Sequence, residues 1–142
     1  MTHRKQAAVA IILLACCLTL YGCPVLLVGG AAVAGGTGTY YYVEGELKRD
    51  YYYPFDKVWS GCEKTIADLR GYDVRPRKDE GMGQGKISAV IEEEKVQISV
   101  KYRGKDSTGK DITTVSVRVG LMGNELSSRL IHDKLAENLT MS

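Results

Sequence analysis

The feature that most restricts the fold is a period-two alternation of apolar and polar side chains in residues 87–119. Three segments place apolar or β-branched residues at every second position, which is typical of strands that bury one face. A charged turn at 92–95 and a polar loop at 104–110 separate them, so we expect antiparallel neighbours. The inward positions are Ile87, Ala89, Ile91, Val96, Ile98, Val100, Tyr102, Thr113, Val115, Val117 and Val119.

Two further strands are expected upstream of these three. Residues 40–53 alternate in the same way, and we interpret them as one long strand with a bulge at Gly45. A short strand is expected at 72–77.

Two segments follow the helical period instead. Apolar residues recur in steps of three and four through 55–69, and Gly71 is the expected end of that helix. A second helix is expected from Glu125 to about Leu139, with Asn124 as its N-cap.

The resulting element order, β-α-β-β-β-β-α, predicts an α+β two-layer sandwich. A curved antiparallel sheet of about five strands would carry both helices on one face, because each element has a single apolar side to bury. This order resembles the TBP-like and helix-grip folds, and a resemblance of topology carries no function with it.

The first 22 residues have the layout of a secretory signal. Arg4 and Lys5 precede an apolar stretch at 7–20, and the segment contains no acid. Subtracting these two cations from the total of 19 leaves 17 Lys or Arg against 17 Asp or Glu. A neutral remainder gives no reason to expect nucleic acid as a partner.

The signal ends in a string that resembles the bacterial lipobox. Leu20 stands three places before Cys23, Gly22 stands just before it, and Tyr21 lies between them. The resemblance implies cleavage before Cys23 and a diacylglycerol on its sulfur, which would hold the protein at a bilayer. Pro24 is not the aspartate that commonly retains lipoproteins in the inner membrane, which favours the outer membrane, facing the periplasm.

A membrane-spanning helix is the alternative interpretation of the same segment. Apolar residues continue past Cys23, and 7–28 is long enough to cross a bilayer. With cleavage, the expected organisation is a signal peptide at 1–22, a lipidated cysteine and apolar Gly/Ala-rich linker at 23–39, and a domain at 40–142.

Several strings resemble a family of small bacterial lipoproteins known only as a domain of unknown function. This resemblance implies lipidation and a periplasmic α+β domain, and it supplies no activity, ligand or catalytic residue. The strings are Thr37-Gly38-Thr39-Tyr40, Val43-Glu44-Gly45-Glu46-Leu47, Asp56-Lys57-Val58-Trp59, Val115-Ser116-Val117-Arg118-Val119-Gly120 and Gly123-Asn124-Glu125, with Ser128 and Ile131.

Residues that could support catalysis are few. His132 is the domain's one histidine, and we expect it at the surface or boundary of the last helix, without partners for a metal site or a triad. Cys62 lies on the apolar stripe of the first helix, where core packing is expected. The glycines of 81–85 lack the spacing of a phosphate loop, so we interpret them as a turn. We therefore expect no enzyme, no cofactor and no metal.

Two sets of side chains are candidates for surface contacts. Alternation predicts that Tyr40, Tyr42 and Tyr52 point away from the core, where they suit a partner or a membrane interface, although tyrosines also simply favour strands. Arg75 and Arg77 belong to a small basic cluster suited to anionic lipid headgroups or an acidic partner, or to local ion pairs.

These observations together predict a membrane-anchored bacterial envelope lipoprotein with a non-enzymatic interaction or structural domain. Its expected partners are the lipid bilayer, through acylated Cys23, and an envelope protein or wall component. The alternative is a periplasmic protein that binds a small apolar ligand in a crevice between the sheet and the helices.

Overall fold

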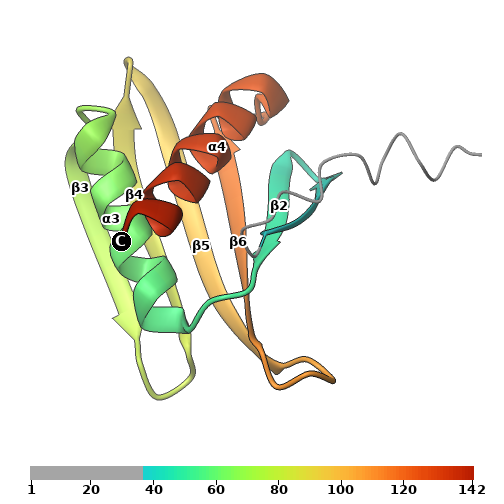
Figure 1. Cartoon of the computed structure of the whole chain (residues 1–142). Coiled ribbons are helices and arrows are strands. Elements are labelled where there is room, and N and C mark those ends of the chain that lie inside the picture. The colour runs from blue at the N-terminus through green and yellow to red at the C-terminus, as the bar shows by residue number, and fades with distance from the viewer. Residues whose placement is uncertain (1–36) are drawn as a thin grey trace, which may run out of the picture. The chain divides into compact units, whose positions relative to one another are not determined.

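The computed structural model describes residues 37–142, which form a two-layer α+β fold in the order β-β-α-β-β-β-β-α (Figure 1). The expected signal peptide, Cys23 and nearly all of the expected linker lie outside the described residues. The elements are β1 (Thr37–Val43), β2 (Glu46–Tyr51), α3 (Phe55–Asp68), β3 (Tyr72–Asp79), β4 (Gln84–Ile91), β5 (Glu94–Lys105), β6 (Asp111–Val119) and α4 (Glu125–Met141).

The strands form one antiparallel sheet in the order β1-β2-β6-β5-β4-β3. Both helices pack on the same face of this sheet, and no other element of residues 37–142 covers the opposite face (Figure 1). The fold class predicted from the sequence is therefore confirmed. No helix within residues 37–142 combines the length and the apolar character needed to cross a membrane.

The core lies between the sheet and the two helices. Alternate residues of β4, β5 and β6 are buried, as the period-two pattern predicts, and they meet the apolar stripes of α3 and α4. The largest of these side chains that are almost fully enclosed include Ile66, Ile87, Ile98, Leu135 and Leu139.

The predicted long strand at 40–53 is wrong, because the chain reverses at Glu44 and Gly45 and forms the β1–β2 hairpin. Both turn residues have positive φ, 53° and 80°, which is the backbone of a type I′ hairpin turn and suits glycine at the second position. The sheet therefore has six strands, and β1 begins at Thr37, inside the segment predicted as linker. The turn moves the helix-facing positions from even residues on β1 to odd residues on β2, since Tyr42 lies opposite Leu47. Three consecutive tyrosines at 40–42 hide this change of parity, so the sequence pattern did not reveal the reversal.

This hairpin turn packs against the loop that leads into α4. A side chain added at Gly123 would lie 2.2 Å from the carbonyl oxygen of Gly45, so the two backbones touch where neither residue has a Cβ. The Arg118 guanidinium donates a 2.6 Å hydrogen bond to the carbonyl of Glu44. Two strings quoted above for the family resemblance, at 43–47 and 123–125, thus meet in space.

A glycine and an amide fix the packing of α3 on α4. Gly61 is buried, and a Cβ there would lie 2.9 Å from Leu139, so the helices approach as closely as the backbone allows. Beside this contact, the fully buried Asn138 amide donates to Thr65 and Asp68, at 3.0 Å each. Its oxygen accepts a 2.9 Å hydrogen bond from Lys64, so the nitrogen and the oxygen of this buried amide both have hydrogen-bond partners.

Gly85→Ala tests the seating of Trp59 on the sheet. The added methyl would lie 2.3 Å from the buried indole, so we expect the free energy of unfolding to fall by about 1–3 kcal/mol in a urea titration. Gly81→Ala is the matched control, since the nearest atom to its methyl, on Asp79, is 3.6 Å away. Equal stability of the two variants would contradict this packing.

Candidate functional site

A buried polar cluster joins the β1–β2 hairpin to α4. Arg49 is only 5% exposed, and its guanidinium donates to the carbonyl of Gly38 at 3.0 Å and to the Tyr40 hydroxyl at 2.8 Å. The Tyr40 hydroxyl in turn donates to the carboxylate of Asp133, which lies 3.9 Å from Arg49. Burial, followed by the bond to Asp133, raises the pKa of Tyr40 well above its ordinary value.

His132 belongs to the same cluster and is fully buried, so its expected place at the surface or boundary was wrong. Its Nε2 lies 2.8 Å from the carbonyl oxygen of Leu47, which can only accept, so Nε2 carries the proton. Its Nδ1 therefore accepts from the Tyr51 hydroxyl at 2.8 Å. The helical period placed His132 beside the apolar stripe. Its burial depends on hydrogen-bond partners on β2, which the sequence around His132 could not reveal.

Hydrogen bonds occupy the side-chain atoms of His132 in this arrangement. Both ring nitrogens of His132 are bonded, and burial lowers its pKa to about 4. Cys62 is fully buried, as predicted, and burial raises the pKa of its thiol far above the ordinary value. Within residues 37–142, no group of three His, Cys, Asp or Glu side chains is placed to hold a metal ion. We conclude that the cluster clamps β1 and β2 to α4.

The uncovered side of the sheet, which we call the open face, carries a different set of side chains. The strand register aligns one residue from each strand in a row across the whole sheet. The members of this row are Tyr41, Lys48, Ser116, Ser99, Lys86 and Arg77, none of which is acidic.

Cations gather on the open face over β3, β4 and β5. Arg77, Lys86, Lys95 and Lys101 are exposed there, and none of them forms an ion pair with any residue of the described part of the chain. Arg75 differs, because it binds Asp73 at 3.1 Å. The neutral total charge of the domain therefore conceals a strong local excess of positive charge.

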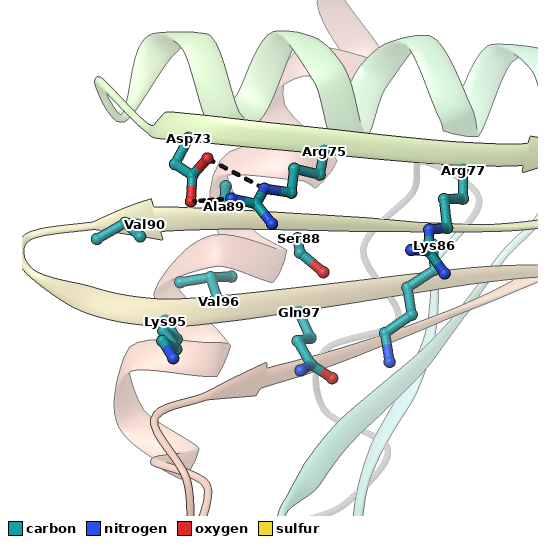
Figure 2. A pocket seen from close by; sticks show the side chains of 10 residues that line it. All are labelled: Asp73, Arg75, Arg77, Lys86, Ser88, Ala89, Val90, Lys95, Val96 and Gln97. Carbon is teal, nitrogen blue, oxygen red and sulfur yellow. Dashed lines mark hydrogen bonds and ion pairs between the residues drawn. The ribbon is translucent and has the colours of Figure 1, made fainter.

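Two shallow hollows of about 430 and 390 Å³ lie on this face and share Arg77 and Lys86. Figure 2 shows the larger one, where the long side chains of Arg75, Arg77 and Lys86 stand over the shorter Ser88 and Gln97. The smaller hollow continues along the same strands toward Ser99 and Lys101. Each hollow also has one aspartate in its lining, Asp73 in the larger and Asp79 in the smaller, but cations outnumber it in both. This excess of positive charge is suited to binding anions.

The predicted surface residues separate into two groups in the structure. Arg75 and Arg77 lie on the open face, but the local ion pair considered in the sequence forms only at Arg75. Tyr40 and Tyr42 face the helix side of the sheet, contrary to the prediction, because the hairpin turn reverses the strand. Tyr40 joins the buried cluster, whereas Tyr42 is 41% exposed at the sheet edge, and Tyr52 is 37% exposed.

Sequence reasoning did not find Lys86, Lys95 and Lys101 as members of this surface. Each alternates with buried residues on β4 or β5, so the period-two pattern assigned them to the outer face of their own strands. The sequence pattern could therefore show that each lysine faces outward on its own strand. It could not show that they form one surface, because that depends on the pairing register, which aligns Arg77 with Lys86.

An apolar cleft of about 390 Å³ opens at one edge of the sandwich, between the helices and the sheet. Its apolar lining comes from the C-cap of α3, from β4, β5 and β6, and from α4, and Glu92 and Glu94 also line it. Leu130 is 63% exposed at its mouth. The apolar lining residues are Leu69, Ile91, Val96, Val119, Leu130 and Ile131.

The fold and surfaces define an α+β domain with one helix-covered face and one open, cationic face. Residues 6–138 match the model of a family described as a protein of unknown function, DUF3568, and the chain belongs to this family. No curated protein matches the chain.

Burial of His132 predicts a loss of stability in mild acid. The native imidazole takes up a proton only near pH 4, whereas the unfolded one does so near its ordinary value of about 6.5. Between these values the unfolded state binds more protons, so the free energy of unfolding falls as the pH decreases, by about 3 kcal/mol in total.

Urea titrations at intervals from pH 7 to pH 4 measure this loss. His132→Gln is less stable at pH 7, and its free energy of unfolding is nearly constant between pH 7 and pH 5, where no carboxylate of shifted pKa contributes. A wild-type curve that is equally flat in that interval would contradict the buried, neutral imidazole.

Proposed function

We propose that the protein is a bacterial envelope lipoprotein, anchored to a membrane by acyl chains on Cys23, and that its domain is a non-enzymatic interaction module. The observation that carries the proposal is the string Leu20-Tyr21-Gly22-Cys23 at the end of a signal-like segment. Two or three acyl chains hold a domain at a bilayer, because each buried methylene contributes about 0.8 kcal/mol.

Two further observations support this function. The family match begins at residue 6, so the apolar part of the signal-like segment and the string that ends at Cys23 lie within the part of the chain that resembles the family. In the domain, the one histidine and the one cysteine of residues 37–142 are both buried, and their reactive atoms are occupied or protonated. The surfaces that remain available are the open face and the apolar cleft, which are suited to binding.

Mass spectrometry of the protein extracted from membranes tests the anchor. We expect a mature chain that begins at Cys23 and carries the added mass of a diacylglycerol, whereas Cys23→Ser retains residues 1–22 and gains no acyl mass. Cys17→Ser is the matched control, because the residue lies in the signal and leaves the lipobox intact. A wild-type chain that begins at Met1 with an unmodified Cys23 would establish the membrane-spanning alternative instead.

Pro24 favours placement in the outer membrane, and a single substitution tests this part of the proposal. Pro24→Asp should move the protein to the inner-membrane fraction of a density gradient, while Pro24→Ser should leave its distribution unchanged. The outer-membrane assignment fails if wild type and Pro24→Asp distribute alike.

The apolar cleft supports a second candidate function, binding of a small apolar ligand between the sheet and the helices. Nile red fluorescence measures access to such a site, and Ser127→Trp should block it, because Ser127 lines the cleft. Ser60→Trp, an exposed position on α3 away from the cleft, is the control. Equal dye binding by both variants would exclude this function.

A further inference from the structure

We propose that the open face of the sheet docks on anionic phospholipid headgroups of the bilayer that holds the anchor. The inference rests on the proposed lipidation for its tether, and on the charge of the open face for its partner. The domain would then lie with its sheet toward the membrane and its helices toward the aqueous side.

The arrangement of charge is the first argument. Arg77 and Lys86 stand directly opposite each other on β3 and β4, and like charges in this position destabilise a sheet. Neither has an acidic partner within 4 Å in the part of the chain described. An external layer of anions removes the repulsion and supplies the missing partners.

The shape and the edges of the open face are the second argument. Its centre carries small hydroxyl residues, Ser99 and Ser116, in register between cations on either side. Its two edges each carry an exposed tyrosine on this face, Tyr41 on β1 and Tyr72 on β3. Tyrosine favours the headgroup level of a bilayer, so a broad cationic surface bordered by tyrosines fits a membrane.

A nucleic acid fits the same face less well. Binding of single strands relies on aromatic side chains placed between the cations, on which successive bases stack. Here the aromatic residues lie at the two edges, and the lining of the hollows between the cations consists of serine, glutamine, aspartate, glycine and aliphatic residues, with no aromatic ring.

The tether allows this docking. Residues 24–36 lie between the lipidated cysteine and β1, and these 13 residues extend to at most about 45 Å. The sheet is about 24 Å wide, from six strands spaced by about 4.8 Å. The whole open face can therefore reach the bilayer in which the anchor is embedded.

Cysteine labelling of the mature lipoprotein, reconstituted in vesicles, tests the proposal. Gln97→Cys reports on the open face and Ser60→Cys on the exposed side of α3. With a membrane-impermeant thiol reagent, Gln97→Cys should react slowly on vesicles that contain phosphatidylglycerol and quickly on pure phosphatidylcholine, whereas Ser60→Cys should react quickly on both. The protein without an added cysteine gives the background.

Charge removal provides the matched comparison. Labelling at Gln97→Cys gives the ratio of docked to undocked domain on anionic vesicles. The double variant Arg77→Gln, Lys86→Gln should lower this ratio by about 25-fold, because each of the two lost charges contributes about fivefold to binding. Arg70→Gln with Lys57→Gln removes the same two kinds of charge from the α3 side and should leave the ratio unchanged. Salt at about 1 M should abolish protection, because it screens charges within about 3 Å.

The outcomes separate this inference from the anchor. Flotation with neutral vesicles depends on the acyl chains alone, so a protein that fails to float with them would refute lipidation and leave the docking face untouched. Labelling of that protein in the presence of anionic vesicles would still test the docking face. Equal labelling of Gln97→Cys on both vesicle types would overturn the docking. Protection by soluble heparin without protection by anionic vesicles would also overturn it, in favour of a polymeric partner.

Discussion

Both helices pack on one face of the six-stranded sheet, and the rest of the molecule depends on this one-sided packing. The covered face takes the Val and Ile side chains of β4, β5 and β6 and the apolar stripes of α3 and α4. The polar and charged residues that alternate with them on these strands point to the opposite, open face. The same alternation of apolar and polar side chains along each strand therefore produces both the core and the cationic surface. A one-residue change of register in any strand would move side chains to the wrong face and disrupt both.

The covered face also contains charge, which it can hold only because every partner is in place. Arg49 is buried, yet its contacts come from the Gly38 carbonyl, the Tyr40 hydroxyl and the Asp133 carboxylate. An arginine of this kind is costly to leave unpaired. The cluster consequently specifies how the β1–β2 hairpin is placed on α4, a position that apolar packing alone would define loosely.

The sequence was sufficient for the architecture because the fold is built from regular periods. The strands at 87–119 and both helices could be predicted from local pattern alone. The reversal at Glu44 and Gly45 could not, because the turn shifts the inward positions from even residues on β1 to odd residues on β2, and three consecutive tyrosines at 40–42 hide that shift. The burial of His132 was missed for a related reason, because its hydrogen-bond partners come from β2, more than 80 residues away. Arg75 and Arg77 were recognised as basic neighbours, but the extent of their surface depends on strand pairing.

The position of β1 has a mechanical consequence. This strand is the first element after the segment that leads from Cys23, and it lies at the edge of the sheet, paired with β2 alone. If Cys23 is anchored as proposed, tension between the membrane and a partner bound to the domain enters at Thr37 and Gly38, where the buried Arg49 side chain binds the backbone carbonyl of Gly38. A pull along the strand must then break the ladder to β2 together with the hydrogen bonds from the buried Arg49 guanidinium to Gly38 and Tyr40, so these side-chain bonds add to the resistance that the single row of backbone bonds gives against peeling.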